Sequence, residues 1–179
     1  SGSIEGLAEG DNIILEGNNQ GYWYVIDTIH PSKDGSIKYA GEPHGYPDIF
    51  RIRVGESSVY FPIDSLETVT VTATAPDIAA NHTLSGSPQA VNLAKVDSML
   101  TASAARNGVK AVVTDDNLKR ELGKMILADP AGVVSYYVIS KSVGNMPLFN
   151  PTTSVDHRII GAVANSYAQL RPNLSLIHI

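Results

Sequence analysis

The chain has 179 residues, an ordinary apolar content of 43%, a formal net charge of −5 and no cysteine. This length suits one generous globular domain or two small ones, and the lack of cysteine excludes disulfides, thiolate metal sites and a cysteine nucleophile. No window approaches the roughly 18 consecutive apolar residues of a membrane span, and residues 1–6 do not resemble a signal peptide. We therefore expect a soluble protein without a membrane partner.

The charges are unevenly distributed along the chain. Residues 1–75 contain 11 acidic and 4 basic side chains, a balance of −7, whereas residues 76–179 contain 7 and 9, a balance of +2. A surface that tracks phosphates is normally basic. The acidic first part therefore favours a protein or a carbohydrate as partner over nucleic acid.

The first part of the chain is predicted to form short strands separated by turn residues such as Gly17, Asp34 and Gly35. Where apolar and polar residues alternate, the pattern is that of a half-buried strand. A single helical turn is expected at residues 62–65. The strands are expected at residues 12–16, 22–30, 37–40, 49–54, 58–61 and 67–74.

Two stretches of this part resemble the opening and closing strands of SH3-like barrels. They are Glu9-Gly10-Asp11-Asn12-Ile13-Ile14-Leu15 and Val59-Tyr60-Phe61-Pro62-Ile63-Asp64-Ser65-Leu66-Glu67-Thr68-Val69. The resemblance covers about a third of the chain and rests on turn spacing and apolar alternation. It implies a small β-barrel at residues 4–75 and no particular activity.

The hydrophobic period changes after residues 76–86, a segment rich in Ala, Thr, Ser and Asn that we interpret as a linker. Residues 87–173 are predicted to be mainly helical, with one or two short strands. The predicted fold class is therefore α+β, with an N-terminal SH3-like barrel followed by a mainly helical segment.

The first predicted helix of this segment starts with Ser87 as N-cap and Pro88 as first residue, and it ends near residue 107. Thr114 is predicted to cap a second helix, whose first turn holds Asp115 and Asp116 as complements of the helix dipole.

The remaining elements are predicted from composition and spacing. Short strands are expected at residues 110–113 and 133–140, the second because it is rich in β-branched and aromatic residues, and a loop is expected at 143–152. The last helix is expected to begin at Thr153 or Ser154 and to bury Ile160, Val163, Tyr167 and Leu170.

Ser154, Asp156 and His157 are the candidate catalytic residues if the protein is an enzyme. Neighbouring helical residues point about 100° apart, so these side chains need partners from elsewhere to form a relay. We prefer a structural interpretation, with Asp156 as a capping or dipole residue in the first turn of the last helix.

Two pairs share the spacing His-x-x-x-Asp, namely His30 with Asp34 and His44 with Asp48. They fall in successive strand connections, which lie at opposite ends of an antiparallel meander, so joint metal coordination is not expected. No nucleotide-binding, hydrolase or metalloprotease motif is present in the sequence. We therefore predict no metal and no cofactor.

Aromatic residues are the remaining candidates for a binding site. Trp23 and Phe61 suit the core, whereas Tyr22, Tyr24 and Tyr46 are the candidate binding residues of an exposed recognition face. The alternative is that all of them are core and rim residues of a small barrel.

Two functions are consistent with these patterns. The first is a non-catalytic structural or binding module, such as a bacteriophage virion or assembly protein from an environmental source. The second is an enzyme, such as a toxin or a cell-wall hydrolase, in which the barrel targets and residues 87–173 act. The lack of a catalytic motif in the sequence favours the first.

The last six residues, 174–179, read as the translation of CTG-TCT-CTT-ATA-CAC-ATC, a series that resembles the transposon-end adapter of short-read sequencing libraries. We interpret them as a sequencing artefact at the end of an environmental gene. The alternative is a genuine apolar tail.

Deletion of residues 174–179 is accordingly expected to leave the thermal midpoint unchanged, because residues without an evolutionary history have no reason to pack. Calorimetry of the full chain and of residues 1–173 measures this. A drop of several degrees, equivalent to about 1 kcal/mol or more, would contradict the interpretation.

Overall fold

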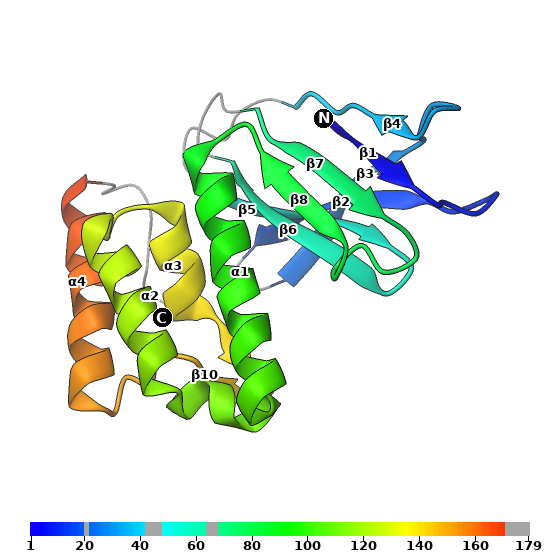
Figure 1. Cartoon of the computed structure of the whole chain (residues 1–179). Helices are drawn as coiled ribbons and strands as arrows, with labels where there is room; N and C mark the ends of the chain where they lie inside the picture. The colour runs from blue at the N-terminus through cyan, green and yellow to red at the C-terminus, as the bar shows by residue number, and fades with distance from the viewer. Residues whose placement is uncertain (20–21, 42–47, 64–67, 171–179) are drawn as a thin grey trace. The chain divides into compact units, whose positions relative to one another are not determined.

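The structure is a computed structural model that describes residues 1–19, 22–41, 48–63 and 68–170. Sheets form the N-terminal part and helices the C-terminal part, so the predicted α+β class is confirmed (Figure 1). The chain divides into two compact units, Ser1–Ala94 and Lys95–Ile179. Helix α1 (Pro88–Asn107) begins in the first unit and ends in the second.

One four-stranded sheet of the first unit is antiparallel and has the order β3-β2-β5-β6. Its buried face carries alternating apolar residues, among them Leu15, Ile52 and Val59, as expected for a sheet with one face on the core. Its strands are β2 (Ile13–Asn19), β3 (Tyr22–Ile29), β5 (Asp48–Val54) and β6 (Ser57–Ile63).

The other four-stranded sheet has the order β4-β1-β7-β8. Its β1 strand pairs in parallel with β7, and the Ser1 ammonium donates a hydrogen bond of 3.0 Å to the Val69 carbonyl. Valines 69 and 71 are buried and the neighbouring threonines are more exposed, as the sequence pattern predicts. The strands are β1 (Gly2–Glu5), β4 (Ser36–Ile37), β7 (Thr70–Thr74) and β8 (His82–Ser85).

The segment 76–86, interpreted from the sequence as a linker, contains β8. This strand forms because Leu84 is buried beside Val71, its partner in the register, and because Ile78 is fully buried just before it. Within the described part of the first unit, strand pairing gives two four-stranded sheets that share no strand. The resemblance to an SH3-like barrel stays a prediction.

The predicted helical turn at residues 62–65 is wrong for its first half, because Pro62 and Ile63 continue β6 in register with β5. Residues 64 and 65 lie outside the described residues, as do Tyr46, His44 and the tail at 174–179.

The second unit is built mainly from helices. Its core contains large side chains from helices and from the connection before the last helix, including Leu122, Ile126, Leu148, Phe149 and Val163. A hairpin of two strands, each two residues long, overlaps the segment 143–152 that was predicted as a loop. The elements are η1 (Val109–Thr114), α2 (Asp116–Ala128), α3 (Val133–Ser140), β9 (Ser142–Val143), β10 (Met146–Pro147) and α4 (Ser154–Leu170).

Two strands predicted in this unit are wrong. Residues 133–140 form helix α3, in which five of eight residues are buried, so the helix has no polar face that would reveal its period. The Ser135 hydroxyl secures the start of α3 through a hydrogen bond of 2.6 Å to the Asp129 carbonyl. Residues 110–113 belong to the 3-10 helix η1.

Helix ends agree with the sequence at one position and differ at another. Ser87 caps α1 as predicted, since its hydroxyl accepts a hydrogen bond of 3.0 Å from the Ala90 amide. The cap of α2 is Asp115 and not Thr114, because Asp115 accepts from the Leu118 amide at 3.1 Å. In α4, Leu170 was predicted to be buried but is exposed.

Ile78→Ala is expected to lower the free energy of unfolding by about 2–4 kcal/mol, because it leaves a cavity at a fully buried position. Urea titration followed by circular dichroism measures the change. Val91→Ala, at an exposed position of α1, is the control and should stay within about 0.5 kcal/mol. Equal effects of the two substitutions would mean that residues 76–81 contribute no packing.

Candidate functional site

The antiparallel register of the β3-β2-β5-β6 sheet assigns each residue to one of two faces. Glu16, Arg51 and Tyr60 lie opposite one another on neighbouring strands, so their side chains share a face. Leu15 and Ile52 lie one position away and point to the opposite, buried face. We call the side that carries Glu16, Arg51 and Tyr60 the polar face.

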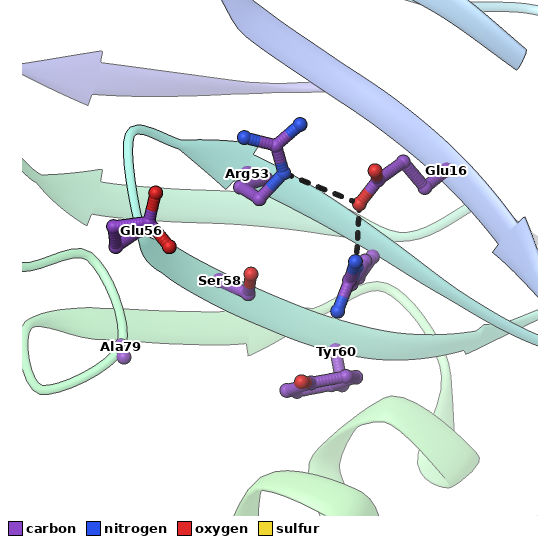
Figure 2. Close-up of a pocket in the computed structure, with 7 residues that line it drawn as sticks. Glu16, Arg53, Glu56, Ser58, Tyr60 and Ala79 are labelled. Carbon is purple, nitrogen blue, oxygen red and sulfur yellow. Dashed lines mark hydrogen bonds and ion pairs between the residues drawn. The ribbon is translucent and has the colours of Figure 1, made fainter. Parts of the chain in front are cut away.

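A buried carboxylate is the centre of the polar face. Glu16 is only 5% exposed, and its Oε2 atom lies 2.5 Å from Nε of Arg51 and 3.5 Å from Nε of Arg53 (Figure 2). A buried charge is tolerated when it is paired and hydrogen-bonded. The two arginines therefore permit Glu16 to occupy a position in the middle of the sheet.

Arg51 responds to the same contacts. Burial lowers the pKa of the Arg51 guanidinium, but the hydrogen bonds and charge interactions with Glu16 and Tyr60 outweigh it and raise that pKa above its ordinary value. Arg51 therefore keeps its positive charge beside Glu16, as arginines in proteins do.

Aromatic rings hold Arg51 from the other side. Its Cζ atom lies 4.4 Å from the ring centre of Trp23, and Trp23 meets Tyr60 edge to face with ring centres 5.6 Å apart. Trp23 was predicted to lie in the core with Phe61. The structure buries Phe61 but leaves Trp23 half-buried. Val25 is the register partner of Glu16, and Trp23 lies on the same side of β3 as Val25, so Trp23 belongs to the polar face.

An open pocket of about 500 Å³ lies on the polar face. Figure 2 shows Glu16 of β2 and Arg53 of β5 directed toward each other, with Ser58 and Tyr60 on β6, the strand next to β5. The polar groups of the pocket are rigidly held because most of them come from strands of one sheet. The pocket is lined by Glu16, Arg51, Arg53, Glu56, Ser58, Tyr60 and Ala79.

The tyrosines predicted as binding residues lie on the other side of β3. Tyr22 is 81% exposed and Tyr24 is 42% exposed, and the period of two places both on the face opposite Trp23. Tyr24 also has a structural role, because its ring covers Gly17 on the neighbouring strand. Tyr46 lies outside the described residues, so two of the three predicted residues are placed on a common face.

The sequence did not single out Val25, which is 59% exposed on the same strand. Its exposure follows from the position of β3 at the end of the sheet order. The four-residue run from Tyr22 to Val25, all aromatic or aliphatic, was the available signal.

The three candidate catalytic residues do not act together in the structure. His157 and Ser154 are exposed, whereas Asp156 is buried. Oδ2 of Asp156 accepts hydrogen bonds from Lys119 Nζ at 2.6 Å, the Asn150 amide at 2.9 Å and the Thr153 hydroxyl at 3.2 Å. Asp156 therefore fastens the start of α4 to α2.

The same contacts determine the acidity of Asp156. Burial raises the pKa of this carboxyl, but the hydrogen bonds from Lys119 and Asn150 and the Lys119 charge outweigh it and hold the pKa below its ordinary value. A depressed pKa means that the folded state is stabilised by the ionised carboxylate.

A second ionisable cluster, in the second unit, was not anticipated. Lys141 Nζ donates to the Tyr137 hydroxyl at 2.5 Å, which donates to Asp97 at 2.8 Å. Burial lowers the pKa of Lys141, and Asp97 partly opposes this. Tyr137 and Lys141 are four residues apart, but Asp97 is distant in sequence, so only the fold reveals the chain of contacts. It ties α1 to the end of α3.

Within residues 1–19, 22–41, 48–63 and 68–170, no three His, Asp, Glu or Cys side chains lie close enough together to hold a metal ion. His30 is exposed, and Asp34 is engaged by the Ser36 amide and hydroxyl at 3.1 and 2.7 Å. His44 is outside the described residues.

Comparison with known proteins assigns no family to this chain. No family model, curated protein or solved structure matches it. Among the helices that the structure describes, none is long and apolar enough to cross a membrane. Function is therefore inferred from the geometry of the sites.

Asp156→Ala is expected to destabilise the fold by about 2–4 kcal/mol near pH 7, because it leaves the half-buried Lys119 ammonium without its partner. His157→Ala, one residue away but exposed, should change stability by less than about 1 kcal/mol.

The gap between the wild type and Asp156→Ala should narrow with acid. A carboxyl with a depressed folded pKa contributes fully above its ordinary value of about 4, and this contribution is lost as the pH falls through the lower folded value. Urea unfolding between about pH 6 and pH 3 measures the gap. A constant gap would show that the charge of Asp156 is not what stabilises α4.

Proposed function

We propose that this chain is a non-catalytic binding module that captures a protein partner through strand β3. The observation that carries the proposal is the exposure of Tyr22 and Tyr24, at 81% and 42%, on one face of a strand at the end of its sheet. Exposed aromatic residues supply large contact areas at low entropic cost and are common anchors of protein interfaces.

The edge of the sheet supports the same role. An edge strand presents backbone groups to which an extended segment of another protein adds as a further strand. Natural proteins protect such edges with charges, prolines or bulges. In β3, Asp27 is the only charged residue, and the register shift leaves Ile26 unpaired, so the bulge of this strand lies just after Val25. Tyr22 to Val25 themselves form a regular, uncharged stretch.

The enzyme hypothesis receives less support from the site geometry. Oδ2 of Asp156 accepts hydrogen bonds from Lys119, Asn150 and Thr153. These contacts hold the carboxylate away from the role of orienting His157 that a catalytic relay would require. A bacteriophage virion or assembly protein is a setting in which a capture module of this kind works, and we retain it as part of the proposal.

Tyr22→Ala is expected to weaken partner capture by roughly ten-fold, because each anchoring aromatic contributes about 1–2 kcal/mol. Tyr24→Ala should act in the same direction. The assay is quantitative pull-down by the full chain from bacterial and virion lysates, with thermal midpoints measured in parallel because Tyr24 covers Gly17.

Tyr39→Ala and Tyr136→Ala are matched controls, since these tyrosines are 40% and 36% exposed but lie outside β3. Both should capture as well as the wild type. A hydrolase screen runs beside the pull-down. Turnover by the wild type that vanishes in His157→Ala, with capture intact in Tyr22→Ala, would replace the binding module by an enzyme.

A further inference from the structure

We propose that the pocket on the polar face binds a neutral saccharide. The pocket residues alternate along their strands with those of the buried face, so the saccharide site uses a different surface from Tyr22 and Tyr24. The inference goes beyond capture of a protein partner and does not depend on it.

The charge of the pocket selects against ionic ligands. Arg51 and Arg53 contribute two positive charges, and Glu16 and Glu56 contribute two negative charges, which cancel. An anion would approach the buried Glu16 carboxylate, and a cation would approach the two guanidinium groups. A neutral ligand with many hydrogen-bonding groups avoids both repulsions and can use donors and acceptors alike.

Glu16 provides an acceptor that is already fixed in place. Both of its ion pairs use Oε2, and the other oxygen, Oε1, has no hydrogen-bond partner among the described residues. No fully buried side-chain oxygen in the same ranges lacks a partner, so Oε1 reaches solvent. An oriented carboxylate oxygen of this kind accepts strongly from a sugar hydroxyl.

Donors lie beside this acceptor. Arg53 uses Nη1 to donate to the Gly55 carbonyl at 2.9 Å and keeps about a third of its side chain exposed. A guanidinium has five N–H groups in a planar fork, so Arg53 has further donors for a pair of adjacent hydroxyls. The Ser58 hydroxyl lines the pocket and makes no hydrogen bond to any described residue, so it is available to donate or accept.

An aromatic surface completes the site. The half-buried Tyr60 ring lines the pocket and is held edge to face by Trp23. The C–H groups on one face of a pyranose ring are apolar and pack against such a ring, while the hydroxyls at its rim meet the charged groups. A volume of about 500 Å³ is in the range of small-ligand pockets.

The experiment uses the full chain and its single tryptophan, which lies against two pocket residues and serves as a local reporter. The probes are cellotetraose, maltotetraose and tetra-N-acetylchitotetraose as neutral saccharides, and oligogalacturonate as a charged one. We expect at least one neutral probe to change the Trp23 fluorescence saturably, and oligogalacturonate to have no effect.

Ser58→Ala and Arg53→Lys should each weaken that binding by about ten-fold, corresponding to roughly 1.4 kcal/mol, while Lys124→Ala on the exposed surface of α2 should not. Shifts of the Arg53 Nε–Hε resonance on addition of the probe provide a second measurement on the unaltered protein. No fluorescence change and no such shift with any neutral probe at about 10 mM, or tighter binding of oligogalacturonate, would overturn the proposal.

The two proposals fail separately. Saccharide binding that persists in Tyr22→Ala, together with partner capture that persists in Ser58→Ala, is expected if both are right. If no saccharide binds but partner capture is observed, only the saccharide proposal is wrong.

Discussion

The polar face of the first sheet depends on one buried carboxylate. Glu16 lies in the middle of β2 and is buried. Burial of a charged carboxylate costs more free energy than burial of an uncharged side chain at the same position. Arg51 and Arg53 compensate for the burial, and Trp23 and Tyr60 in turn fix Arg51. Each of these groups has a defined position because Glu16 is present. An arrangement of paired charges often costs stability relative to an apolar one, which is why we expect a ligand on this face.

The same sheet explains how two surfaces arise on one small unit. Strand residues alternate between faces, so Tyr22 and Tyr24 point one way and Trp23 the other. Among the described residues, β3 also stands at the end of the sheet order. By contrast, the ionisable groups of the second unit, at Asp156 and at Lys141, connect helices to one another. Asp156, which looks reactive in the sequence, is held in contacts between helix α4 and its neighbours, and both candidate binding sites lie on the first sheet.

Sequence patterns predicted the α+β class and most strands of the first unit, because period-two alternation is strong where one face of a strand is buried. They missed β1 and β8, which are four residues long and pair with β7. They also assigned α3 to a strand, since a helix buried on several sides has no amphipathic period. Tyr22 was singled out from the sequence because it belongs to an aromatic run, and the structure places it on an exposed position of β3. The Glu16–Arg51 pair was not singled out, because 35 residues separate the two and only the strand register brings them together.

Tyr24 and Gly17 illustrate how the register constrains the evolution of this sheet. An added Cβ at Gly17 would lie 2.7 Å from Cζ and Oη of Tyr24, so any larger residue at position 17 displaces the ring. An aromatic residue laid across a strand glycine is a known way to restore the packing that glycine lacks. The two positions are therefore expected to covary in homologous sequences, with glycine retained wherever the tyrosine is retained. Where Tyr24 is replaced by a smaller residue, position 17 should accept larger residues. A substitution at position 17 of β2 should likewise change the position of the Tyr24 ring, and with it the exposed surface of β3.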